Sequence, residues 1–270
     1  MQEQIIYPEY KLSPDGLGDI YASPRSGYRG FLAVAFLTVI LCVPVLVYKF
    51  KLGGNAKVIS RGFESSEVFN LGAENKELFL SIVSSRERRE LASKIHYVGE
   101  IVKATGKFPN NWKTISAAIV LESKRANIDP FLVTALVKSE STFNPFAKSN
   151  QGALGLMQLL PGTGEYISKV TKTDWQGSRR LENIEYNLRL GIAYLKYLRR
   201  YFGDNVEQAL IAYNWGPGNL LKAIKNSSKV PQSPVDYAKK ILGNHSRWRD
   251  DYQTRKAEYQ YIQISDIAIG

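Results

Sequence analysis

Apolar residues recur every three or four positions along most of the chain after residue 84, which is the spacing of one face of an α-helix. This pattern predicts helices near 84–104, 112–126 and 130–141, and further helices around 188–202, around 206–213 and after Pro217. Glycine, proline and asparagine separate these segments, and no strand-like alternation of useful length interrupts them. The sequence therefore predicts an all-α fold.

A run of uncharged residues over 30–48 lies between Arg29 and Lys49. At about 1.5 Å per residue, a helix of this length crosses the roughly 30 Å hydrocarbon layer of a membrane. A cleaved secretory signal is disfavoured, because the run begins well inside the chain and has no small-residue cleavage site. We predict a single transmembrane helix over 30–48, although basic residues on both sides leave its topology open.

The rest of the chain divides around this run. Residues 1–29 are rich in proline, glycine, serine and tyrosine and are predicted to form a flexible tail. Residues 49–110 are expected to be a linker or stalk with one helix, and 111–270 the main helical domain. Whether the helix near 84–104 belongs to a stalk or packs on that domain is left open by the pattern.

Composition narrows the possible chemistry. The 270 residues include one cysteine, Cys42, and two distant histidines, His96 and His245, so neither a metal cluster nor a Cys-His nucleophile is predicted. We expect no cofactor. The net charge of +11 attracts polyanions, but no nucleic-acid-binding motif is present and no nucleic-acid partner is predicted. Carboxyl, amide and hydroxyl groups must supply the chemistry.

One acidic residue lies in an apolar helical stripe. Asp129 and Pro130 are typical of a helix start, and Leu132, Leu136 and Glu140 then recur every four residues. A carboxyl group at the end of a buried stripe loses hydration, which raises its pKa toward the range useful for a proton donor. Glu140 is therefore the candidate acid. The same spacing also fits an ordinary polar residue on a last helical turn.

Three segments favour the catalytic interpretation of this acid. In chain order they are Glu140-Ser141, Gly155-Leu156-Met157-Gln158 and Ala212-Tyr213-Asn214. Together they resemble the motifs of the soluble lytic murein transglycosylase (SLT) family, the goose-lysozyme-like lytic transglycosylases among the glycoside hydrolases. The resemblance implies a lysozyme-like helical domain over 111–270.

The resemblance also implies a reaction. Such enzymes cleave the β-1,4 bond of peptidoglycan between N-acetylmuramic acid and N-acetylglucosamine and leave a 1,6-anhydro ring on the muramyl end. Glu140 would protonate the leaving oxygen as general acid and then, as a carboxylate, remove the proton of the muramyl C6 hydroxyl. Ordinary glycosidases use a second carboxyl group, and the motifs here supply no obvious one.

Six further positions match substrate-binding or site positions of the family: Ser149, Met157, Gln158, Tyr213, Asn214 and Tyr237. Ser149 and Gln158 are expected to hydrogen-bond the glycan, and Met157 to line the groove. Tyr213 is assigned to the active site, whereas packing is the favoured role for Asn214.

Two positions depart from the family pattern. Trp215 stands where a small residue is common. In the segment that often reads E-T-x-x-Y, Tyr237 is present but the acidic position is not, and Asp236 is a weak substitute.

The leading hypothesis is a peptidoglycan lytic transglycosylase anchored by 30–48 in the cytoplasmic (inner) membrane of the cell, with its catalytic domain on the periplasmic side. Its partners would be glycan strands and that membrane. A goose-type lysozyme, in which the same acid works with a positioned water, is one alternative. A noncatalytic glycan-binding scaffold of an envelope-spanning machine is another.

Overall fold

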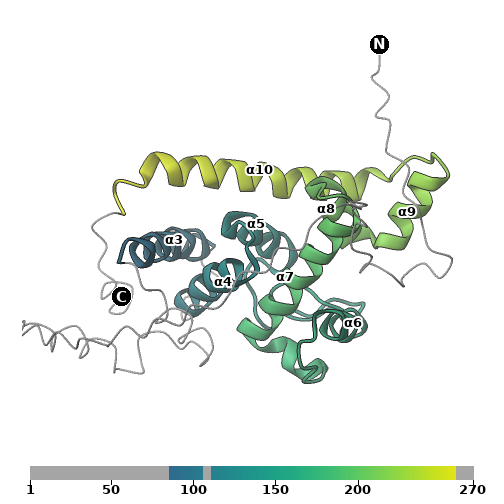
Figure 1. Ribbon diagram of the computed structural model, residues 1–270, viewed down its shortest axis with the longest axis horizontal. Coiled ribbons are helices and arrows are strands. Elements are labelled where there is room, and N and C mark those ends of the chain that lie inside the picture. The colour runs from purple at the N-terminus through teal and green to yellow at the C-terminus, as the bar shows by residue number, and fades with distance from the viewer. Residues whose placement is uncertain (1–84, 106–110, 260–270) are drawn as a thin grey trace, which may run out of the picture. The chain divides into compact units, whose positions relative to one another are not determined.

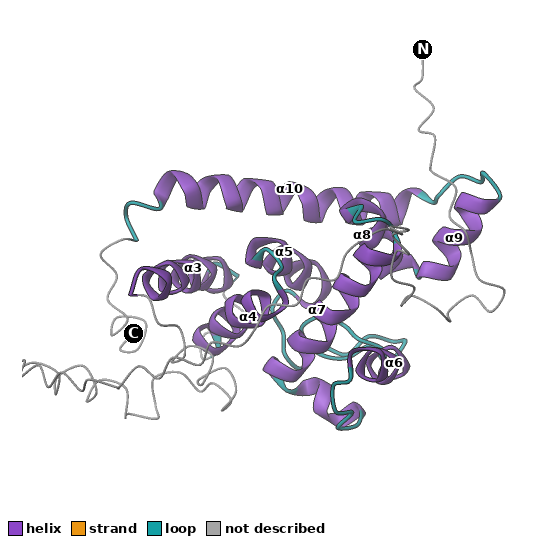
Figure 2. Ribbon diagram, viewed as in Figure 1, coloured by secondary structure: helices purple, strands orange, loops and turns teal. Residues whose placement is uncertain are grey.

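The computed structural model describes residues 85–105 and 111–259 (Figure 1). Their helices are α3 (Ser85–Lys103), α4 (Trp112–Ala126), α5 (Pro130–Ser141), α6 (Pro161–Thr171), the 3₁₀ helix η1 (Ser178–Glu182), α7 (Ile184–Tyr201), α8 (Val206–Trp215), α9 (Pro217–Lys225) and α10 (Gln232–Arg255). Loops join these helices, and no strand is drawn among the described residues (Figure 2). The prediction of an all-α fold is confirmed.

The predicted tail and transmembrane segment, 1–29 and 30–48, lie outside the described residues. Within the two described ranges, none of the helices combines the length and the apolar character needed to span a bilayer.

Helix α5 lies at the centre of the domain, and its start follows the predicted chemistry. The Asp129 carboxylate accepts a hydrogen bond of 2.9 Å from the Phe131 N–H, and Pro130 occupies the first helical position. Every residue from Phe131 to Val137 is buried. The helix ends at Ser141, and the residue that caps it, Thr142, has a left-handed φ of 50°. Because α5 is buried on nearly all sides, its last turn is held in a fixed place.

The other helices enclose α5 through a chain of pairwise contacts. Helices α4 and α10 pack on α5, α3 and α7 pack on α4, and α8 joins α7 to α10. Figure 1 shows α10 as a long helix that runs beside α5 and α8. A smaller apolar cluster lies under α6 and consists of Leu159, Ile167, Leu181, Tyr186 and Leu190. The loop that follows α5 therefore connects the main core to this second cluster.

Helix α3 is a packing layer of this domain. Its predicted stripe is buried, with Ile95 and Val98 at 1% and 0% exposure. The Tyr97 hydroxyl donates to Asp251 of α10 at 2.7 Å, and Ser93 shares a hydrogen bond of 2.7 Å with Tyr252. Of the two roles that the sequence leaves open for this segment, the contacts support packing on the domain.

Helix α10 is not among the helices that the sequence pattern predicts. Pro234 lies in its first turn, where a missing N–H costs little because the first N–H groups of a helix have no partner within it. Its buried side chains, Ala238, Ile241, Trp248 and Tyr252, still follow helical spacing. The charged residues between them obscure this stripe in the sequence.

A buried carboxylate joins α4 to α7. Glu122 is 1% exposed, and its oxygens lie 3.0 Å from Arg189 Nη2 and 3.3 Å from Arg125 Nε. A carboxylate without such partners would pay a large desolvation cost at this position. The contact between Glu122 and Arg189 therefore fixes the spacing between α4 and α7.

We expect Glu122→Gln to destabilise the fold by about 2–4 kcal/mol, because it removes the buried negative charge that both guanidinium groups contact. Glu165→Gln is the control, since Glu165 pairs with Lys169 on the surface of α6 at 2.8 Å. An exposed pair of this kind contributes about 0–1 kcal/mol. Chemical denaturation measures both values, and equal losses in the two variants would contradict a structural role for the buried pair.

Candidate active site

Glu140 lies in the last turn of α5, on the stripe that the sequence predicts. Leu132 and Leu136 of the same stripe are 3% and 0% exposed. The Glu140 side chain is partly buried, and loss of hydration raises the pKa of its carboxyl group from 4.5 to about 7. Near neutral pH the group is therefore divided between its acid and its carboxylate form, as a side chain that both gives and takes a proton requires.

Two tyrosines from later helices surround this carboxyl group. The Tyr237 hydroxyl, on α10, donates a hydrogen bond to Glu140 Oε1 and opposes the rise of the carboxyl pKa. The Tyr213 hydroxyl, on α8, donates to the Met157 carbonyl at 2.8 Å. Burial and the nearby Glu140 charge raise the pKa of both phenols well above the usual value. Both tyrosines therefore stay protonated and act as donors.

Glu140 has no carboxylate partner among the described residues. Burial and the Tyr237 hydroxyl are the causes of its pKa shift, with no contribution from another Asp or Glu. Asp236, next to Tyr237, is exposed and accepts a hydrogen bond of 2.8 Å from Gln232. The expectation that Asp236 is at best a weak substitute for a second acid agrees with this position.

The loop after α5 is fixed against the site by a buried amide that the sequence analysis missed. Asn187 on α7 is 1% exposed. Its Oδ1 accepts from the Met157 N–H at 2.8 Å, and its Nδ2 donates to the carbonyls of Leu154 and Leu181, both at 2.9 Å. The available signal was an asparagine within the apolar face of α7, since a buried amide must find partners.

Helix α5 also holds this loop directly. The Ser141 hydroxyl, next to Glu140, donates to the Leu156 carbonyl at 2.8 Å. This contact gives the serine of the Glu140-Ser141 pair a structural role. The loop and the acid consequently share one rigid support.

Ser149 and Gln158 hydrogen-bond the loop itself. Ser149 Oγ accepts from the Ala153 N–H at 3.0 Å. Gln158 Nε2 donates to the carbonyls of Ala147 and Gly155, at 3.1 and 2.9 Å. Both side chains therefore shape the loop after α5.

The Met157 side chain does not line an open groove. It is 0% exposed and packs against α7 at Gly191, where an added Cβ would lie 2.3 Å from its sulfur. Met157 faces the site through its backbone carbonyl, the acceptor for Tyr213. Its thioether fits into the core because Gly191 of α7 has no side chain to occupy the same space.

Asn214 is exposed on the last turn of α8, so the structure gives no support to the packing role favoured for it. Trp215 is partly buried against the main core, and its carbonyl accepts a hydrogen bond of 2.7 Å from Asn219. At these two adjacent positions, the polar side chain faces solvent and the aromatic ring packs inward.

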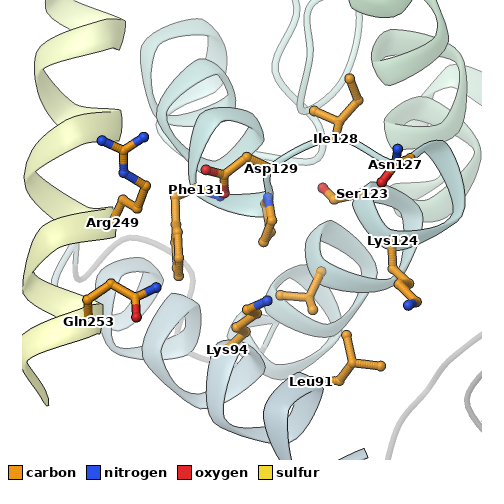
Figure 3. A pocket seen from close by; sticks show the side chains of 12 residues that line it. Leu91, Lys94, Ser123, Lys124, Asn127, Ile128, Asp129, Phe131, Arg249 and Gln253 are labelled. Atoms are coloured by element: carbon orange, nitrogen blue, oxygen red, sulfur yellow. The ribbon is translucent and has the colours of Figure 1, made fainter. Parts of the chain in front are cut away.

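A pocket of about 340 Å³ lies at the opposite end of α5 (Figure 3). Asp129, Phe131, Lys94 and Arg249 are among its lining residues, and none of the predicted site residues is. Asp129 is paired with His245 at 2.8 Å and Lys94 with Glu90 at 2.9 Å. The start and end of α5 are about 15 Å apart at the usual rise, which separates this pocket from Glu140. No cluster of metal-ligating side chains occurs within 85–105 and 111–259.

Fold and site together define a helical domain built around one desolvated glutamic acid. Residues 117–235 match the family model for the transglycosylase SLT domain. The match covers less than half of the chain, and over these residues the resemblance read from the three motifs is confirmed. Glu140, the loop and Tyr213 lie within the match, and Tyr237 lies just beyond its end.

Several known proteins are similar to this chain. The soluble lytic murein transglycosylase of Salmonella typhimurium is 40% identical over 95 residues, which cover 35% of this chain and 15% of that protein. The membrane-bound lytic murein transglycosylase C of Histophilus somni is 35% identical over 121 residues, which cover 42% of this chain and 33% of that protein. The chain thus spans at most a third of the length of these two relatives.

Among solved structures, the 70 kDa soluble lytic transglycosylase of Escherichia coli aligns with 71% of this chain and 34% of its own length. The alignment has 21% identity and a TM-score of 0.48.

We expect Gly155→Ala to cost about 1–3 kcal/mol more than Gly152→Ala, because only Gly155 is crowded. Both glycines have left-handed φ, 75° and 82°, so both variants pay the same penalty of about 1–2 kcal/mol. An added Cβ at Gly155 would lie 2.4 Å from the Leu181 carbonyl oxygen, whereas Gly152 has open space. Thermal unfolding of the two variants measures the difference, and equal costs would show that the loop is not packed tightly against Leu181 of η1.

We expect Glu140→Gln to stabilise the protein at pH 8 by about 3 kcal/mol and to have little effect at pH 4. The folded-state pKa is raised to about 7 from 4.5, so the unfolded chain ionises first as the pH rises. Glu140 therefore lowers stability increasingly between pH 4.5 and 7, and a neutral amide avoids this loss. A pH-independent difference between the two proteins, measured by denaturation, would contradict the raised pKa.

Proposed function

We propose that this protein is a peptidoglycan lytic transglycosylase that cleaves the β-1,4 bond between N-acetylmuramic acid and N-acetylglucosamine and forms 1,6-anhydro-muramyl ends. The observation that carries the proposal is Glu140, a desolvated acid with a pKa of about 7 on a buried helix. The SLT domain match and the names of the relatives support the same activity.

In this proposal Glu140 performs both proton transfers. Its acid form protonates the oxygen of the leaving sugar, and the resulting carboxylate takes the proton of the muramyl C6 hydroxyl as that oxygen attacks the anomeric carbon. Tyr237 favours the carboxylate by donating to Oε1, which lowers the cost of the first transfer. Burial favours the acid and restores it after the second transfer.

Two-carboxylate hydrolysis is disfavoured, because retaining and inverting glycosidases place a second acid within about 5–9.5 Å. No such partner influences Glu140 among the described residues. In the proposed reaction the nucleophile is a hydroxyl group of the substrate, and the sugar's own 2-acetamido group helps to stabilise positive charge at the anomeric carbon.

A noncatalytic scaffold is disfavoured by the cost of this acid. A carboxyl group whose folded-state pKa is raised destabilises the protein at neutral pH. A module that only binds glycan has no use for the raised pKa that causes this loss of stability, whereas a proton donor requires the raised pKa.

The loop after α5 supplies most of the proposed substrate contacts. Ser149 and Gln158 brace the turn through backbone hydrogen bonds, so that its peptide groups can meet the acetamido groups of the glycan. Tyr213 fixes the Met157 carbonyl beside the acid. Asn214 is exposed at the end of α8 and is proposed to contact the sugar directly.

We further propose that 30–48 is a single-pass anchor in the cytoplasmic (inner) membrane and that the helical domain lies on the periplasmic side. The uncharged run and the location of peptidoglycan support this placement. The Histophilus somni relative is itself named as membrane-bound.

We expect Glu140→Gln to reduce the release of anhydro-muropeptides from purified sacculi by about 10²- to 10⁴-fold, the usual contribution of a general acid. Binding to sacculi should persist, because the amide preserves shape. Glu165→Gln, on an exposed pair, is the control and should retain full activity.

Mass spectrometry of the released sugars reports the outcome of this experiment. Reducing muramyl ends from the wild-type protein would identify a goose-type lysozyme instead. Undiminished digestion by the Glu140→Gln variant would show that another residue is the acid.

A further inference from the structure

The pocket at the start of α5 is enclosed by four helices. Its lining residues come from α3, α4, α5 and α10 and from the turn between α4 and α5 (Figure 3). Its volume of about 340 Å³ lies at the lower end of the range of small-molecule sites, about 300–1,000 Å³. At about 30 Å³ for each water, it has room for about ten waters or for a molecule with a similar number of non-hydrogen atoms.

One buried hydroxyl group in the wall of this pocket has no partner. Ser123 is 0% exposed, and its Oγ forms no hydrogen bond with any described residue. The equally buried Ser116, two helical turns earlier on α4, donates to the Lys113 carbonyl at 3.0 Å. Ser123 is a lining residue, and Figure 3 shows its hydroxyl directed toward the cavity. Because an unsatisfied buried hydroxyl is costly, a ligand that brings a hydrogen-bond acceptor into the pocket removes that cost.

The charged side chains that line the pocket are mostly cationic. A single acid, Asp129, lines it together with three cations, which are Lys94, Lys124 and Arg249. The acids that neighbour these cations have side chains that are 42–67% exposed and do not line the pocket: Glu90, Glu87 and Asp250. Exposed pairs of this kind are weak, so an anion in the pocket can compete with them for the cations.

Apolar side chains form the rest of the wall. Those that are at most 8% exposed are Leu91, Val120, Ile128 and Phe131. The Asp129 carboxylate, which accepts from the Phe131 N–H and pairs with His245, adds a fixed negative charge on one side. Apolar walls favour a ligand with an apolar body, and the fixed negative charge disfavours a ligand that carries more than one charge.

We propose that this pocket binds a small organic monoanion, a carboxylic acid with an aromatic or branched aliphatic body. The carboxylate accepts hydrogen bonds from the Ser123 hydroxyl and the Lys94 ammonium group, whose ends point toward the same space in Figure 3. The apolar body packs on Phe131. The inference does not rest on the proposed function, since none of the predicted site residues lines this pocket.

The test uses one probe and a neutral compound of the same shape. The probe is phenylacetate, which has an aromatic body and one carboxylate, and its control is phenylacetamide. Each is titrated into the full chain, and the NMR shifts of the Asn127 and Phe131 backbone amides, two lining residues, give the Kd. The measurement needs no glycan, so its failure and the failure of the proposed function are distinguishable.

Two variants are compared with matched controls. Ser123→Ala removes the unpaired hydroxyl, and Ser116→Ala removes a paired serine hydroxyl from the same helix. Lys94→Gln removes a cation of the pocket, and Lys169→Gln removes a lysine with the same kind of glutamate pair on α6. Ser123→Ala should fold normally, because the hydroxyl that it removes has no partner to lose.

We expect the wild-type protein to bind phenylacetate with a Kd of about 1 mM or below and phenylacetamide about tenfold more weakly. Ser123→Ala and Lys94→Gln should each weaken phenylacetate binding by about fivefold or more, because each removes a hydrogen bond to a charged group. Both controls should retain the wild-type Kd. The absence of saturable binding to the wild-type protein, equal affinity for the acid and the amide, or an unchanged Kd in Ser123→Ala would each overturn the proposal.

Discussion

The balance of two forces on the Glu140 carboxyl group determines what this domain can do. Burial at the end of α5 disfavours the ionised form, and the Tyr237 hydroxyl favours it. Burial prevails, and the resulting pKa of about 7 keeps both protonation states within reach. A fully solvated glutamate would be a poor acid, and one fully enclosed without a donor would be a poor base.

The rest of the structure fixes the geometry of that balance. Tyr237 reaches the carboxyl group because α10 packs beside α5, and α3 supports α10 through Tyr97 and Ser93. On the other side, Asn187 and Ser141 hold the loop whose carbonyl receives the Tyr213 hydroxyl. These hydrogen bonds join residues far apart in the sequence. A change in the packing of α10 on α5 is therefore expected to alter the pKa of the Glu140 carboxyl group.

The sequence predicts the features that depend on local spacing. The Asp129 cap, the buried stripe to Glu140 and most helix positions follow from residues within a few turns of one another. Features that depend on tertiary contacts are not predicted. Asn187 is an ordinary polar residue until Met157 and Leu154 are placed against it, and Met157 is assigned to a groove until Gly191 opens space for it in the core. The apolar stripe of α10 is interrupted by charged residues, and its helical spacing is recognised only once α10 is seen to pack on α5.

Direct titration of Glu140 tests the central claim most closely. Carbon-detected NMR of the protein labelled at glutamate carboxyl carbons follows the ionisation of this side chain, with Glu140→Gln used to assign its signal. We expect a midpoint near pH 7, and a higher midpoint in Tyr237→Phe because the donor to the carboxylate is lost. A midpoint near 4.5, unchanged by Tyr237→Phe, would contradict the account.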